Sequence, residues 1–70
     1  MKQHPKIVAR QEVAKIEADG YEFIKIETAK SSGVWELKHA NGNSITIEWE
    51  TIPFDHVVIV KNGKVVKFIQ

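Results

Sequence analysis

The spacing of hydrophobic residues changes once along the chain, near Gly20. Before it, apolar residues recur every three or four positions, which predicts an amphipathic helix at about residues 5–19. Pro5 suits the first position of such a helix, and Gly20 suits its end. The stripe expected to be buried consists of Val8, Ala9, Val13 and Ile16, with Glu12 intruding on it.

From Tyr21 onward the period becomes two, as expected for strands with one buried face. Clusters of Gly, Asn, Ser and Pro separate five such segments. The predicted strands cover residues 21–29, 34–39, 44–50, 56–61 and 64–69. The expected fold class is therefore α+β. A single domain over residues 1–70 packs the helix on a five-stranded antiparallel meander, either a small curled sheet or a partial barrel.

A turn at Asn41-Gly42 fixes the register of the second and third predicted strands. A two-residue loop would pair core residues with solvent residues, although cross-strand partners share a face. A three-residue loop, residues 40–42, places Gly42 in a left-handed conformation and closes the turn with a bulge. It pairs two sets of apolar residues, Trp35 with Ile47 and Leu37 with Ile45.

The last hairpin is apolar on both of its faces. A two-residue type I′ turn at Asn62-Gly63 pairs Ile59 with Val66 and Val57 with Phe68. The opposite face then carries His56, Val58, Val60, Val65, Lys67 and Ile69. Either the hairpin is central and covered on both faces, or it presents apolar surface to another molecule. We favour coverage within the domain.

The loop over residues 51–55 contains two large apolar residues, Ile52 and Phe54. Pro53 and Asp55 indicate a turn at this point. We expect Ile52 and Phe54 to close the open end of the core. The alternative is that they form an exposed anchor for a partner.

Composition limits the class of protein. The 70 residues include no cysteine, and His4, His39 and His56 are widely spaced, so neither a disulfide scaffold nor a zinc site is predicted. No apolar run approaches the roughly 20 residues that span a bilayer, and the first residues do not resemble a signal peptide. We expect a cytoplasmic protein with no metal, no cofactor, no membrane contact and no small-molecule ligand.

The net charge of +1 hides an uneven distribution. Residues 1–15 carry +3, residues 16–55 carry −5 and residues 56–70 carry +3. We expect the basic ends to be attracted to the acidic middle. The alternative is that one charged patch faces a partner.

No group of residues predicts catalysis. The four glycines stand apart, so no phosphate-binding loop is present, and no cysteine nucleophile exists. Glu48 and Glu50 share one face of a strand, with Glu36 on the neighbouring strand. Paired carboxylates act as acid and base where a cleft perturbs their pKa values. Because these lie on an open strand face, we predict that the protein is not an enzyme.

One stretch of the chain has the motif order of a known family. It combines a helix, Gly20-Tyr21, a polar turn ending in Gly33, the segment Trp35 to Gly42, and Ile45-Thr46-Ile47. Through these features residues 14–47 resemble the first half of HicA-type toxins of toxin–antitoxin pairs. The resemblance implies a fold like that of double-stranded-RNA-binding domains. That family cleaves RNA with a histidine that directly follows a Gly-Ser pair. In this sequence Val34 and Trp35 follow Ser32-Gly33, so the catalytic histidine is missing and the resemblance does not imply nuclease activity.

The tail from Val57 to Ile69 has a second resemblance. It is similar to hairpins in small proteins of Gram-positive phages and prophages. This resemblance implies a small regulatory or inhibitory protein that acts by binding.

The main functional prediction is a non-enzymatic protein-interaction module, a phage- or mobile-element-encoded modulator or inhibitor of a larger cytoplasmic partner. Self-association through the last strand is its nearest variant. The predicted contact residues are Ile52, Phe54, Val58, Val60 and Ile69, with Glu48 and Glu50 for a basic partner. One alternative is a nucleic-acid-binding module that uses Lys6, Arg10, Lys61, Lys64 and Lys67. A second is a divergent HicA-like RNA-binding protein without nuclease activity.

Overall fold

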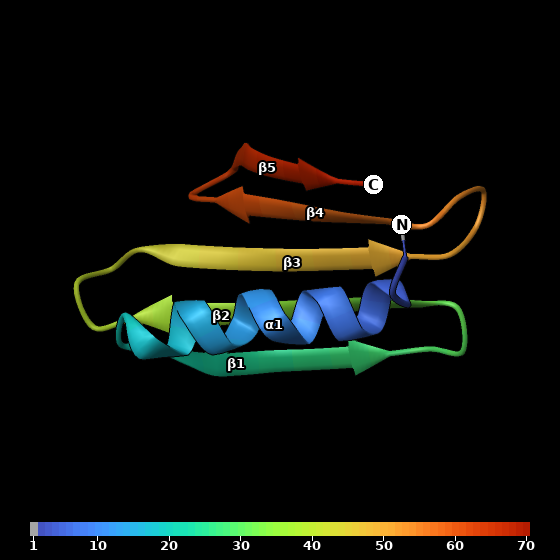
Figure 1. Ribbon diagram of the computed structural model, residues 1–70. Coiled ribbons are helices and arrows are strands. Elements are labelled where there is room, and N and C mark those ends of the chain that lie inside the picture. Colours follow the sequence, from blue (N-terminus) through green and yellow to red (C-terminus); the bar gives the residue numbers. More distant parts are fainter. Residues whose placement is uncertain (1) are drawn as a thin grey trace.

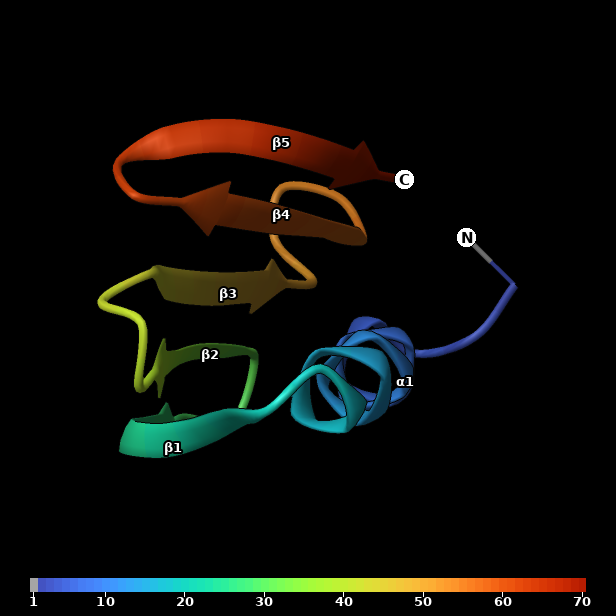
Figure 2. The same cartoon turned by 90° about the vertical axis from the view of Figure 1, so that its left-hand side faces the viewer.

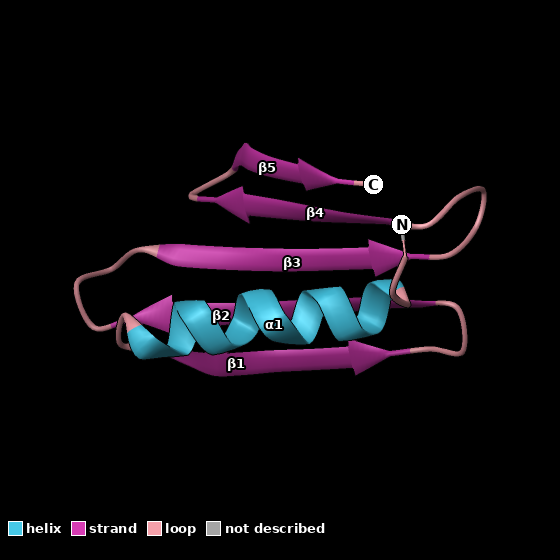
Figure 3. Ribbon diagram, viewed as in Figure 1, coloured by secondary structure: helices cyan, strands magenta, loops and turns pink. Residues whose placement is uncertain are grey.

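The computed structural model describes residues 2–70, so residue 1 of the predicted domain lies outside the described part. These residues form one helix and a five-stranded antiparallel sheet (Figures 1 and 3). The elements are α1 (Pro5–Ala18), β1 (Tyr21–Thr28), β2 (Ser32–His39), β3 (Ser44–Glu50), β4 (His56–Lys61) and β5 (Lys64–Ile69). The predicted α+β class is confirmed. The strands lie in chain order, and the sheet stays open with β1 and β5 as its edges.

The helix covers one face of the sheet only. Figure 2 shows α1 on one side of the strands, where it packs against β1, β3 and β4, with β5 at the far edge of the sheet. The core lies between helix and sheet and combines Ala9, Val13 and Ile16 with Tyr21, Trp35, Leu37, Ile45, Ile47, Trp49, Val57 and Ile59. No element of residues 2–70 covers the other side, which we call the open face. Coverage of the last hairpin on both faces was therefore a wrong expectation.

The register of β2 and β3 follows the hydrophobic pattern. Trp35 pairs with Ile47 and Leu37 pairs with Ile45, as predicted. Gly42 has a φ of +97°, and its N–H donates to the carbonyl of His39 at 2.9 Å. The three-residue loop is therefore confirmed. Its left-handed residue is glycine because other residues adopt this conformation at a cost.

The β4–β5 hairpin keeps its predicted turn but not its predicted register. Asn62 and Gly63 both have positive φ, as a type I′ turn requires, and Val60 pairs with Val65. A bulge follows at residue 66, so that Lys67, and not Val66, pairs with Ile59. The predicted pairs Ile59–Val66 and Val57–Phe68 are wrong. The bulge turns residues 67 and 69 toward the core side and residue 68 toward the open face.

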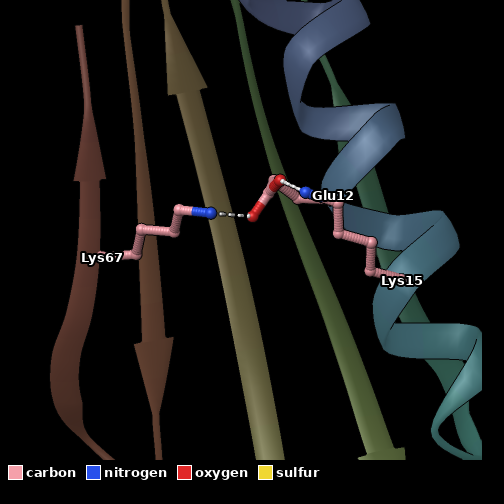
Figure 4. A network of polar contacts seen from close by, with 3 residues as sticks. All are labelled: Glu12, Lys15 and Lys67. Carbon is pink, nitrogen blue, oxygen red and sulfur yellow. Dashed lines mark hydrogen bonds and ion pairs between the residues drawn. The ribbon is translucent and has the colours of Figure 1, made fainter.

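The shifted register gives a buried carboxylate its partner. Glu12 lies on the buried stripe of α1 and is 8% exposed. Its two oxygens accept hydrogen bonds from Lys67 Nζ at 2.8 Å and Lys15 Nζ at 3.0 Å (Figure 4). A buried carboxylate without such partners is strongly destabilising. With a regular hairpin Lys67 would point to the open face, away from Glu12.

These contacts also set the ionisation of Glu12. Burial alone would raise the pKa of the Glu12 carboxyl. The hydrogen bonds and positive charges of Lys67 and Lys15 outweigh burial and hold this pKa below its ordinary value of 4.5.

No ion pair among residues 2–70 joins a basic end to the acidic middle. Among residues 2–70 the ion pairs are Lys15–Glu12, Lys67–Glu12 and Lys25–Glu27. The first lies within residues 1–15, the second joins residues 1–15 to residues 56–70, and the third lies within the acidic middle. The negative charge of the middle is therefore left largely unpaired.

Candidate functional site

The open face has a charged half over β1 to β3. Register places Glu22 opposite Lys38 and Lys25 opposite Glu36. Lys25 Nζ also lies 3.0 Å from a carboxylate oxygen of Glu27, and this hydrogen bond raises the pKa of Lys25. The acids of β1 and β2 therefore have lysines nearby.

Glu48 and Glu50 differ from the other acids of this face. They lie on β3, opposite Val58 and His56 of β4. Neither carboxylate forms an ion pair with any described residue. They form an acidic row along the border between the charged half and the last hairpin.

The other half of the open face is apolar and lies over β4, β5 and the loop before them. We define the open-face patch as Phe54, His56, Val58, Val60, Val65 and Phe68. The rings of Phe54 and His56 lie 4.9 Å apart, and His56 stacks on Phe68 at 5.8 Å with an interplanar angle of 14°. The His56 Nδ1 lies 2.8 Å from the carbonyl oxygen of Phe54. These contacts hold the loop side chain beside the strands.

The open-face patch is accessible to solvent. Phe54 is 48% exposed and Phe68 is 52% exposed, while Val58 and Val60 are half-buried. Isolated apolar side chains on a surface are ordinary, but a contiguous group marks an interaction site. The predicted role of Phe54 in closing the core is wrong, because its ring lies against His56 on the open face.

The structure brings together most of the predicted contact residues. Val58 and Val60 face the open side, Phe54 joins them, and Glu48 and Glu50 border them. Ile52 lies in the same loop and is 68% exposed, so it does not close the core either.

Ile69 does not belong to this set. It pairs with Val57 and packs partly buried against the core cluster. Its assignment to the binding face is corrected, because the bulge at residue 66 moves it to the helix side of the sheet.

Sequence reasoning placed His56 and Val65 on the correct face of the hairpin without naming them as contact residues, and it missed Phe68 as a member of the open-face patch. Phe68 was placed in the core because the regular hairpin register puts it there. One signal pointed to the true register: Glu12 interrupts the buried stripe of the helix and needs a cation nearby. Lys67 supplies that cation only if the strand contains a bulge.

The basic residues of the nucleic-acid alternative lie in two groups. Lys6 and Arg10 line a groove between α1 and β1. Lys61 and Lys64 pair beside the β4–β5 turn, and Lys67 bonds to Glu12. Two strands separate β1 from β4, a distance of about 14 Å at the usual strand spacing. The five residues therefore form no continuous basic stripe.

No three His, Asp or Glu side chains of residues 2–70 come together in a way that would hold a metal ion. The described helix is too short and too polar to span a membrane.

Comparison with known proteins found no relative. No protein-family model matches the chain, and no similar protein was found among the curated sequences or the solved structures. The resemblances of residues 14–47 and of the last hairpin remain predictions.

Proposed function

We propose that this protein is a non-enzymatic interaction module that binds a larger protein through the open face of its sheet. The contact surface of that partner is apolar at its centre and carries lysine or arginine along one border. A small domain that binds in this way acts as a modulator or inhibitor of its partner. The observation that carries the proposal is the exposed open-face patch beside the unpaired Glu48 and Glu50.

The apolar part of the proposal rests on the ring stack. A row of three rings lies on the open face, in which His56 contacts both Phe54 and Phe68. Aromatic side chains held in this way lose little conformational entropy on binding and are frequent binding hot spots. A partner that covers them removes apolar surface from water at about 25 cal/mol per Å².

The charge of the open face favours a basic partner. Five acids and two lysines face outward from β1 to β3. A second copy of this chain would bring the same net negative charge to the interface, so the charge disfavours self-association through this face. Lysine or arginine on the partner would instead pair with Glu48 and Glu50, which have no ion-pair partner in the described chain.

The proposal is tested by binding measurements on matched variants. Protein captured from a lysate by the wild-type chain is purified, and its affinity for each variant is measured by calorimetry. We expect Val58→Lys to weaken binding by at least about tenfold, because it places a charge within an apolar contact. Replacing Glu48 and Glu50 by Gln should weaken binding less and reduce its dependence on salt.

The control is Gln11→Lys, which makes the same change of charge on the exposed side of α1. It should leave the affinity unchanged. Phe68→Ala provides a second open-face variant if Val58→Lys lowers stability. The proposal is contradicted if the open-face variants bind as tightly as the wild type, or if Gln11→Lys weakens binding equally.

A further inference from the structure

A groove of about 440 Å³ lies between α1 and β1, on the side of the sheet opposite the open face. It exists because β1 is an edge strand that the helix does not fully cover. Every residue of β1 after Tyr21 is exposed. The lining residues are Lys6, Arg10, Val13, Ala14, Glu17, Phe23, Ile26, Thr28 and Trp35.

The floor of the groove is apolar. Trp35 is buried beneath it, and Phe23 and Ile26 rise from β1 with 36% and 61% of their surfaces exposed. Val13 and Ala14 form the wall on the helix side. Small-molecule sites typically have volumes of about 300–1,000 Å³ and combine such apolar walls with a few polar groups.

The polar groups lie at the two ends of the groove. The helix runs antiparallel to β1, so the start of α1 lies beside the end of β1 (Figure 1). Lys6 and Arg10 therefore share one end with Thr28, whereas Glu17 and Phe23 lie toward the other end. Neither Lys6 nor Arg10 forms an ion pair with a described residue. One end is thus cationic and the other end is anionic.

Thr28 adds a hydrogen-bond donor to the cationic end. Its hydroxyl oxygen accepts the indole N–H of Trp35 at 3.1 Å. A hydroxyl can also donate one hydrogen bond, and the accepted bond from Trp35 leaves that hydrogen available. Lysine, arginine and hydroxyl donors together suit an anionic head group.

We propose that this groove binds a small amphipathic carboxylate. The apolar body of the ligand lies on Phe23, Ile26 and Trp35, and its carboxylate faces Lys6, Arg10 and Thr28. The ligand is elongated, because the wall from Lys6 to Glu17 covers about 16 Å of helix axis at 1.5 Å per residue. It has a single acidic group, because Glu17 would repel a second one at the far end.

The test uses three ligands with the same alkyl chain: octanoate, 1-octanol and octylammonium. Binding is measured by calorimetry, and the contact residues are located by NMR chemical-shift changes. Octanoate should bind more tightly than 1-octanol, whereas octylammonium should bind more weakly than octanoate and with its head group reversed toward Glu17. Shifts should concentrate at Phe23, Ile26 and Ala14 and leave Val58 unaffected.

Two variants separate the charge from the groove itself. Replacing Lys6 and Arg10 by Gln should lower octanoate affinity about tenfold or more and leave octanol affinity unchanged. The control replaces Lys61 and Lys64 by Gln, which removes the same charge beside the distant turn and should have no effect. Ala14→Trp fills the groove from the helix side and should abolish the binding of octanoate and of 1-octanol.

The proposal is overturned if octanoate does not bind, or if octanoate and octanol bind equally to the wild type. It is also overturned if Ala14→Trp folds normally and still binds. None of these experiments tests the open face, so the groove proposal and the proposed function can each be contradicted independently of the other.

Discussion

At the scale of single residues, close contacts restrict what particular positions can carry. Gly33 of β2 pairs with Trp49 of β3, and Trp49 is almost completely buried. A Cβ atom placed on Gly33 would collide with the indole nitrogen of Trp49. The small residue at position 33 is therefore required by packing. The sequence showed a turn at this point but not the indole ring that lies over it.

Gly33→Ala should destabilise the protein by about 1–3 kcal/mol, because the indole must move within a packed core. Urea unfolding of the purified variant measures this loss. Trp49→Phe removes the colliding nitrogen and leaves an aromatic ring in place. The double variant should therefore lose less stability than the sum of the two single variants, and additive losses would contradict the packing argument.

Glu12 makes the stability of the protein depend on pH. Its pKa in the folded state lies below the ordinary value of 4.5, which it regains on unfolding. The ionised carboxylate therefore contributes its full stabilisation above the unfolded pKa. That contribution is lost as the pH falls through the lowered folded pKa.

Replacing Glu12 by Gln should reduce the free energy of unfolding at pH 7 by about 1 kcal/mol, because Lys67 and Lys15 lose a charged acceptor. Below the folded pKa the variant and the wild type should converge. Urea melts between pH 3 and pH 7 measure both effects. Glu17→Gln, at an exposed position of the same helix, is the control and should reproduce neither effect.

At the scale of elements, local patterns predicted the helix and the β2–β3 hairpin. Alternation of apolar residues fixes Trp35 opposite Ile47, and Gly42 permits the loop that this pairing needs. The β4–β5 register could not be read in this way, because both faces of that hairpin are apolar and either register is locally acceptable. What favours the bulge is Lys67 bonding to Glu12, a contact between residues 55 positions apart.

The bulge is tested by nuclear Overhauser effects between the strands. The observed register predicts cross-strand contacts between Ile59 and Lys67 and between Val58 and Phe68. A regular hairpin would instead give contacts between Ile59 and Val66. Replacing both Glu12 and Lys67 by apolar residues should weaken the contacts of the observed register. Unchanged contacts in that variant would show that the Glu12–Lys67 ion pair does not stabilise the bulged register.

At the scale of the whole molecule, strand order decides which surfaces are covered. The sequence identified apolar residues on both faces of the last hairpin, but it did not reveal that this hairpin lies at one edge of the sheet with only one face toward the helix. The groove beside β1 was missed for the same reason. The open face has no helix over it, and the groove arises because one helix does not cover the full width of the other face.

Two neighbouring valines of β4 test this description of the two faces. Val57 is completely buried on the core side, whereas Val58 is half-buried on the open face. Val57→Ala should cost about 2–3 kcal/mol of stability, because it leaves a cavity in the core. Val58→Ala should cost less than about 1 kcal/mol. Equal losses in urea unfolding would mean that the open face is covered within the monomer.

The measurement that most directly tests the central claim is photo-crosslinking in the cells that make this protein. A photoreactive phenylalanine analogue replaces Phe68 on the open face or, as a control, Gln11 on the exposed side of α1. We predict one discrete adduct with a larger protein from position 68 and none from position 11, and the adduct should disappear when Val58→Lys is added. The claim is contradicted if position 68 gives no adduct, an adduct with a second copy of this chain, or the same adduct as position 11.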